Sequence, residues 1–97
     1  MVRQLADGSY KYMFTVYALW NEMNDKIYIG QTDNIERRLQ QHQMKLKRGS
    51  YSARISGDWK LAYKEEKETR KDALFREREL KSCKGREFIR QQIVKLK

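Results

Sequence analysis

Five side chains in this sequence are of types that can bind a phosphate ester and move a proton beside it. They are Tyr17, Tyr28, Arg38, His42 and Glu77. The two tyrosines stand eleven positions apart, and Arg38 and His42 are one helical turn apart. Hydrolysis of a phosphodiester needs an in-line water, a group that removes its proton, and positive charge on the non-bridging oxygens. The five residues are therefore candidates for a site with that chemistry.

Each candidate also has a purely structural interpretation. A guanidinium such as that of Arg38 can hold phosphate oxygens in bidentate fashion. His42 is the one histidine in the chain and could shuttle a proton, although a lone helical histidine is often just a surface residue. Most strand tyrosines only pack their rings and hydrogen-bond their hydroxyls. Glu77 could simply form a salt bridge with a nearby Lys or Arg. The joint spacing, not any single residue, favours the chemical interpretation.

The charge balance favours a polyanionic partner. The 97 residues include 22 Lys and Arg against 13 Asp and Glu, a formal net charge of +9. A polyanion such as nucleic acid is the leading partner on this charge, although many small basic domains bind none, and the family resemblance described below makes DNA the first candidate. Because no appended DNA-reading motif is present, we expect contacts to backbone and shape. The expected phosphate-binding residues are Arg37, Lys45, Lys47, Arg54 and Lys81.

Cysteine content and hydropathy exclude several classes of protein. Cys83 is the only cysteine, so neither a disulfide framework nor a clustered thiolate zinc site is expected. The most apolar stretch, Tyr12–Trp20, is far shorter than the roughly 20 residues of a membrane span, and no cleavable signal precedes it. We expect a cytoplasmic protein with no membrane partner. Its oligomeric state does not follow from the sequence.

Two extended segments at the start of the chain predict a hairpin. Alternation over residues 12–20 places Phe14, Val16, Ala18 and Trp20 on one face and Met13, Thr15, Tyr17 and Leu19 on the other, as in a strand covered on both faces. Lys26–Gln31 predicts a second strand, and the intervening Asn24-Asp25 favours a turn. Gly30 should end that strand where the backbone passes close to another group.

The remainder predicts three helices and a third strand. Asp33 and Glu36 indicate a helix start of the capping-box kind, with the helix continuing to about Lys47. Gly49–Asp58 is expected to be a loop, and Trp59–Lys64 a strand. Later helices are predicted from Thr69 and Asp72, with Ala73, Leu74 and Leu80 buried, and after Gly85, with Phe88, Ile89, Ile93 and Leu96 as its apolar residues. The predicted fold is α/β: a three-stranded antiparallel sheet flanked by helices, in the order β-β-α-β-α-α. One small domain over residues 12–97 should follow a polar arm over residues 1–11.

The segments Thr15-Val16-Tyr17 and Tyr28-Ile29-Gly30 resemble the two signatures of the GIY-YIG endonuclease superfamily. The second is intact and the first lacks its usual leading residues. The likeness continues through residues 31–39, where Arg38 occupies the catalytic-arginine position, and through residues 73–81, which resemble the small single-domain bacterial members. Ser52 stands where those members usually carry threonine. Lys81 matches a lysine of their motif, and its chemistry alone assigns it no role.

This resemblance implies specific roles for the candidates. It implies that Glu77 holds one divalent ion, Mg²⁺ or Mn²⁺, with waters and substrate phosphate completing the coordination. It implies general-base action by Tyr17, which requires nearby positive charge because a free phenol has a pKa of about 10, and orientation of water or phosphate by Tyr28. The sequence therefore predicts a metal-dependent endonuclease, which could be structure-selective in DNA repair or recombination. The alternatives are a catalytically weak nucleic-acid-binding module of the same fold and a plain interaction domain.

Overall fold

The fold is built on one central strand with a neighbour on each side. The computed structural model describes residues 2–4, 6–44 and 57–96, without the side chains of residues 3, 10, 11 and 41–44. The strands β3 (Phe14–Asn21), β4 (Lys26–Thr32) and β5 (Trp59–Lys67) form an antiparallel sheet in the order β4-β3-β5. The predicted three-stranded antiparallel sheet is confirmed, and β4 and β5 are its edges.

Strand β3 supplies side chains to two layers. Val16, Ala18 and Trp20 lie in one buried cluster, and Tyr17 and Leu19 lie in another. The predicted alternation is therefore confirmed, as is the prediction that both faces are covered. The turn after β3 contains Asp25 with a φ of 50°, in the left-handed region that a short polar side chain tolerates. It brings β4 back along β3, with Tyr17 opposite Gly30.

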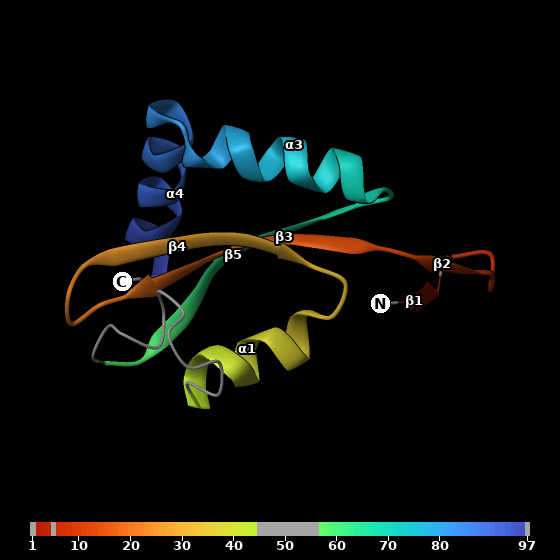
Figure 1. Cartoon of the computed structure of the whole chain (residues 1–97), viewed down its shortest axis with the longest axis horizontal. Helices are drawn as coiled ribbons and strands as arrows, with labels where there is room; N and C mark the ends of the chain where they lie inside the picture. Colours follow the sequence, from red (N-terminus) through yellow and green to blue (C-terminus); the bar gives the residue numbers. More distant parts are fainter. Residues whose placement is uncertain (1, 5, 45–56, 97) are drawn as a thin grey trace.

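In the described part of the chain, three helices cover the sheet unequally. Helix α1 (Ile35–Met44) lies on one side, whereas α3 (Arg70–Lys81) and α4 (Cys83–Leu96) lie on the other (Figure 1). With the strands, they give the predicted order β-β-α-β-α-α. The two-helix side buries Ala73, Leu80, Ile89 and Ile93 against the apolar side of β3 and β4. Within the described ranges, no helix is long and apolar enough to span a membrane.

The N-terminal arm contains a small hairpin of its own. Strands β1 (Val2–Gln4) and β2 (Tyr10–Tyr12) pair antiparallel and project from one end of the sheet (Figure 1). The Tyr12 hydroxyl donates to Asp33 just before α1, at 2.5 Å. The arm is therefore connected to the first helix by at least one side-chain contact.

Strand β5 contains an irregularity that the alternating sequence does not indicate. Ala18 pairs with Tyr63 and the next residue, Leu19, pairs with Leu61, so Ala62 is an extra residue in β5. A bulge of this kind changes the face on which later side chains lie. Leu61 accordingly packs with the cluster containing Tyr17, and Tyr63 with the opposite cluster.

Several element boundaries and burial predictions were wrong. Gly30 does not end β4, because that strand continues to Thr32. Asn34, not Asp33, caps α1: its side-chain oxygen accepts from the backbone N–H of Arg37 at 3.1 Å. Leu74 and Leu96 are 43% and 53% exposed, since they lie on the outer sides of their helices. The predicted cap of α3 is confirmed, with Thr69 accepting from the Asp72 N–H at 3.1 Å. The predicted end of α1 near Lys47 and most of the predicted loop over residues 49–58 lie outside the described residues.

Candidate active site

Two tyrosines and an arginine meet between α1 and the sheet. Nε of Arg38 donates a hydrogen bond to the hydroxyl of Tyr17 at 3.2 Å. The rings of Tyr17 and Tyr28 are neighbours, with centroids 6.1 Å apart and planes inclined by 31°. The structure thus brings together three of the five predicted residues, from β3, β4 and α1, into one cluster.

Gly30 makes room for this cluster. It lies opposite Tyr17 in the β3–β4 pair, so the two residues are on the same face of the sheet. A Cβ added at Gly30 would lie 2.9 Å from the Tyr17 hydroxyl oxygen and 3.1 Å from the Tyr28 ring. Any larger residue would push the tyrosines away from their present positions. The expectation that the backbone passes close to another group at Gly30 is confirmed, and that group is a pair of phenols.

Neighbouring packing fixes the position of each member. Trp59, at the start of β5, is 1% exposed and contacts the Tyr28 ring edge-on at a centroid distance of 6.4 Å. Helix α1 is held on the sheet by Ile35 and Leu39, which pack in the same cluster as Tyr17. Arg38 lies in the first turns of α1, where its backbone N–H donates to the Asn34 carbonyl at 3.1 Å. The capped helix start thus determines where the guanidinium reaches the sheet.

Burial and the neighbouring guanidinium shift the pKa of Tyr17 in opposite directions. Tyr17 has no exposed surface, and this burial raises the pKa of its phenol well above the ordinary value, more than the hydrogen bond from Arg38 lowers it. The pKa of Arg38 is raised, first by its hydrogen bond to Tyr17. At neutral pH the cluster therefore contains a protonated phenol next to a guanidinium.

Glu77 lies in the other layer. It is on α3 between the buried residues Ala73 and Leu80, and its carboxylate accepts from Lys81 Nζ at 3.1 Å. The side chain of Glu77 is 21% exposed and that of Lys81 is 51% exposed. Within the part of the chain that the structure describes, this ion pair is the interaction of the Glu77 carboxylate, and the two tyrosines and Arg38 do not contact it. Helix α3 packs against β3 and β4 on the face of the sheet opposite the Tyr17 cluster.

The donor set around Glu77 fits a weakly held hard cation. Among the described residues, no group of three or more His, Cys, Asp or Glu side chains comes together. Magnesium requires less than that, since one or two carboxylates with waters and substrate phosphates suffice. The ammonium of Lys81 already shows that the carboxylate accepts a cation, and because Lys81 is half-exposed the pair is worth only about 1 kcal/mol. Glu77 could therefore exchange Lys81 for a metal ion at little cost.

Only some of the remaining predicted residues lie in the described part of the chain. Arg37 is exposed on α1, next to Arg38 but on a different side of the helix. His42 lies within α1, and its side chain is outside the described part. Lys45, Lys47 and Arg54 lie outside the described residues. Of the predicted phosphate-binding residues, Arg37 and Lys81 can therefore be placed, one in each layer.

Sequence reasoning overlooked two supporting residues and a polar atom. Trp59 was predicted only as a strand residue, and Asn34 was passed over for Asp33 as the helix cap. Gln31 has a buried side-chain oxygen with no hydrogen-bond partner among the described residues. It lies opposite Val16, on the α3-facing side of β4. An apolar residue at the start of a strand and an Asn before a helix are signals that could have identified the first two.

One protein-family model matches most of the chain. The family model for the GIY-YIG catalytic domain matches residues 13–89, from just before β3 into α4. No curated protein and no solved structure matched the chain. The matched range contains both tyrosine motifs, the arginine of α1 and the carboxylate of α3, in the order that the sequence resemblance implies. This chain therefore belongs to the GIY-YIG family, a family of nucleases.

Proposed function

We propose that the protein is a divalent-metal-dependent endonuclease that hydrolyses phosphodiester bonds in nucleic acid, with DNA as the first candidate substrate. The observation that carries the proposal is the hydrogen bond between Arg38 Nε and the Tyr17 hydroxyl above Gly30. It joins a cation on a helix to a buried phenol on the central strand. An arginine and a phenol held in this way are suited to a phosphate and to the water that attacks it.

Arg38 would bind the non-bridging oxygens of the scissile phosphate. Its planar guanidinium is oriented by the bond to Tyr17, and orientation of this kind limits the conformational entropy lost when the substrate binds. The positive charge then opposes the negative charge that develops on the phosphoryl oxygens in the transition state.

Tyr17 would position the water and accept its proton. In the substrate-free protein the raised pKa keeps the phenol protonated, so base action requires additional positive charge when the substrate complex forms. Tyr28, packed against Tyr17 on the edge strand, would orient the same water or a phosphate oxygen. Glu77 would hold Mg²⁺ or Mn²⁺, which supplies Lewis-acid charge for the phosphate and the leaving oxygen.

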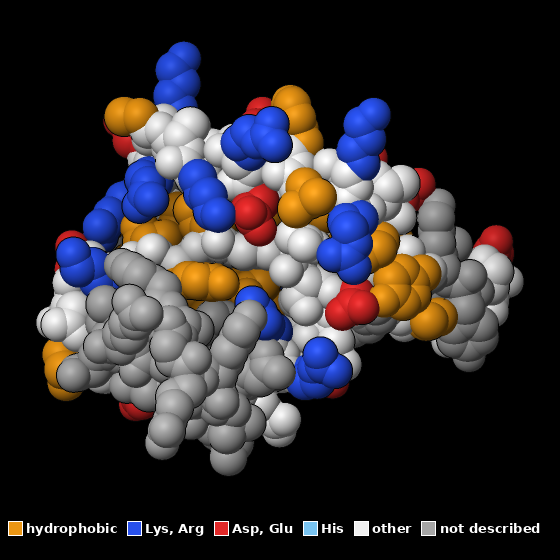
Figure 2. Space-filling model, viewed as in Figure 1, with side chains coloured by type: hydrophobic (Ala, Val, Ile, Leu, Met, Phe, Trp, Pro, Cys, Tyr) orange, Lys and Arg blue, Asp and Glu red, His pale blue; other side chains and the backbone are white. Residues whose placement is uncertain are grey.

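The positively charged surface supports a nucleic-acid substrate. Figure 2 shows Lys and Arg side chains spread over the part of this face where Figure 1 places α3 and α4. The cluster and the basic surface together fit hydrolysis of a strand held mainly by its phosphates. A structure-selective role in DNA repair or recombination would be one form of this activity.

The proposal is tested by cleavage assays on branched, single-stranded and duplex DNA and on RNA, with and without Mg²⁺ or Mn²⁺. Arg38→Gln should abolish turnover at saturating substrate, because it removes the guanidinium next to Tyr17. Arg37→Gln is the matched control, since it removes the same charge one residue away on the exposed side of α1. The control should weaken binding and leave the maximal rate nearly unchanged. Metal-independent binding without cleavage of any substrate would instead identify a binding module of the same fold.

A further inference from the structure

A small pocket lies at the outer edge of β4, between the two layers. It is lined by Ile27, Tyr28, Ile29, Lys81 and Arg86. The two isoleucines belong to the α3 and α4 side of the sheet, whereas Tyr28 packs with the cluster on the α1 side. Lys81 is the last residue of α3, and Arg86 lies in the first turn of α4. The pocket therefore adjoins both the tyrosine cluster and the Glu77–Lys81 pair.

The charged residues lining this pocket are both basic. Among the described residues, its ionisable side chains besides the Tyr28 phenol are Lys81 and Arg86, and no carboxylate lines it. Nε of Arg86 donates to the Lys81 carbonyl oxygen at 3.3 Å, which directs the guanidinium along the helix junction. A guanidinium has five N–H donors, so four donors of Arg86 are without a partner among the described residues. An anion with several acceptor oxygens is the ligand that this lining suits best.

The position of Tyr28 relates this anion to the scissile phosphate. Tyr28 lines the pocket and also lies 6.1 Å, ring to ring, from Tyr17. Arg38 in turn donates to the Tyr17 hydroxyl. A phosphate in the pocket and a phosphate at Arg38 would therefore lie on either side of the Tyr17–Tyr28 pair, where one strand can carry both. A backbone phosphate satisfies both the charge and this position.

We propose that Lys81 and Arg86 bind a backbone phosphate of the cut strand close to the scissile bond, and so position that strand across the edge of β4. This inference rests on the proposed nuclease function and names a further contact of the same site. Both residues are positioning residues, since they hold the strand without touching the reacting atoms. Lys81, for which the sequence resemblance gave no role, acquires one here.

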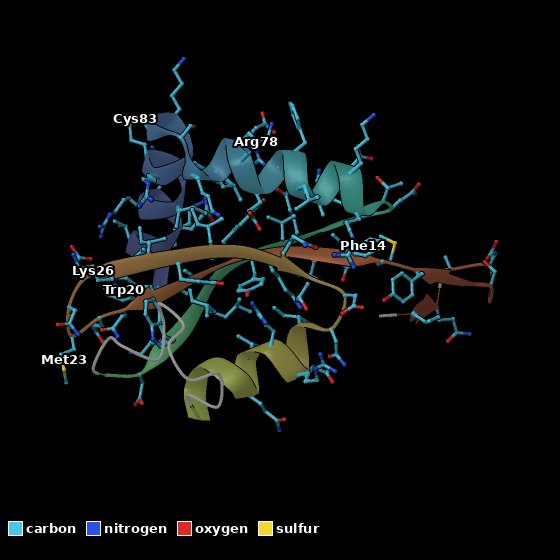
Figure 3. All side chains as sticks on the ribbon, in the orientation of Figure 1. Phe14, Trp20, Met23, Lys26, Arg78 and Cys83 are labelled. Carbon is cyan, nitrogen blue, oxygen red and sulfur yellow. The ribbon has the colours of Figure 1, made fainter. Side chains whose placement is uncertain are left out.

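Arg86 provides the cleaner test, because Lys81 also pairs with Glu77. Arg86→Gln is compared with Arg78→Gln, which removes an equal charge from the exposed side of α3 that faces away from the sheet (Figure 3). Binding is measured without divalent metal, on labelled strands in which one phosphate at a time is replaced by an uncharged methylphosphonate. Thermal melts of both variants verify that they are folded.

The wild type should lose affinity at a limited set of phosphate positions. Arg86→Gln should bind more weakly, reduce the slope of log affinity against log salt by about one unit, and become insensitive to replacement at one position close to the cut. Arg78→Gln should keep the wild-type pattern of sensitive positions. If Arg86→Gln loses as much affinity as the wild type at every position, the phosphate site is wrong.

The two proposals can fail separately. An Arg86-dependent position in a protein that cuts none of the substrates would overturn the nuclease function and keep only a phosphate contact of Arg86, without relation to a cut. Metal-dependent cleavage with no Arg86-dependent position would keep the nuclease and overturn the phosphate site. A wild type without salt-dependent binding to nucleic acid overturns both.

Discussion

The two faces of the sheet are built from different kinds of side chain, although both use the same central strand. On the α1 side, β3 contributes the Tyr17 phenol, which is buried with Trp59 and hydrogen-bonded to Arg38. On the α3 and α4 side, it contributes Val16, Ala18 and Trp20 to an apolar core. The first face carries polar groups whose arrangement suits chemistry, and the second carries apolar area that stabilises the fold. Substitutions on the two faces should therefore have different consequences.

Tyr17→Phe should separate catalysis from stabilisation of the fold most clearly. The variant keeps the packed ring and removes the hydroxyl, so cleavage should fall by about 10²–10⁴-fold, the usual contribution of general acid–base catalysis. Single-turnover cleavage and thermal unfolding measure the two effects. Tyr63→Phe, a half-buried tyrosine whose ring packs on the opposite face, is the control and should cut normally. Equal cleavage by Tyr17→Phe would transfer the base role to Tyr28 or to another group.

Leu80→Ala should lower stability and leave cleavage by the folded protein unchanged. Leu80 has no exposed surface in the apolar core, so its truncation should lower the free energy of unfolding by about 2–5 kcal/mol. Cleavage per folded molecule should be retained. Leu74→Ala is the matched control on the same helix, because Leu74 is 43% exposed, and it should change stability by about 0.5 kcal/mol or less. Denaturant unfolding of both variants checks the difference, and equal losses would refute the assignment of this core.

Gly30→Ala should affect the polar face through crowding. The added Cβ would stand 2.9 Å from the Tyr17 hydroxyl oxygen, so we expect a stability loss of about 1–3 kcal/mol and a larger loss of cleavage. The double variant with Tyr17→Phe removes the nearest atom. The stability loss caused by Gly30→Ala should therefore be smaller in the Tyr17→Phe background. Additive losses in this cycle would show that the tyrosine hydroxyl is not what Gly30 accommodates.

Glu77→Gln tests the metal proposal on the other face. The pair with Lys81 is half-exposed, so its loss should change the free energy of unfolding by about 1 kcal/mol or less, while Mg²⁺-dependent cleavage disappears. Glu79→Gln removes a carboxylate that is 49% exposed, two residues along α3, and should keep cleavage. A large fall in melting temperature for Glu77→Gln, with residual cleavage by the folded fraction, would assign Glu77 a structural role.

Alkaline pH should lower the free energy of unfolding through Tyr17, by less than the substitutions above. The folded pKa of Tyr17 lies above its unfolded value of about 10, so the unfolded chain releases this proton first as the pH rises. The associated stability is fully present below about pH 10 and is lost as the pH rises toward the folded pKa. The free energy of unfolding, measured from neutral pH to above pH 10, should fall less steeply with pH for Tyr17→Phe than for the wild type. Parallel curves would show that burial does not perturb this phenol.

The parts of the fold that follow local periodicity could be predicted from the sequence. The alternation in β3 and the Thr69 cap of α3 depend on neighbouring residues only, and both are confirmed. The rotation of a helix about its axis depends on what it packs against, which is why Leu74 was wrongly predicted to be buried. The extra residue at Ala62 likewise depends on pairing with β3.

The candidate site likewise contains some residues that the sequence identified and others whose positions depend on the tertiary fold. The motif spacing identified Tyr17, Tyr28 and Arg38, because a hairpin and the helix after it bring these residues together over a short stretch of chain. The location of Glu77 in the opposite layer, and its pairing with Lys81, depend on how α3 crosses the sheet. No local pattern contains that information, and neither does it indicate that Arg86 reaches the edge of β4.

Strand β4 is an edge of the described sheet, and this also bears on solubility. An edge strand exposes backbone donors and acceptors to which another chain can add a strand, and proteins commonly oppose this with charged side chains. Lys81 and Arg86 stand beside this edge, so a second copy approaching edge to edge would meet like charges. The same two cations that we propose attract a phosphate strand would thereby discourage self-association, and neutralising both should raise light scattering in concentrated, low-salt solutions.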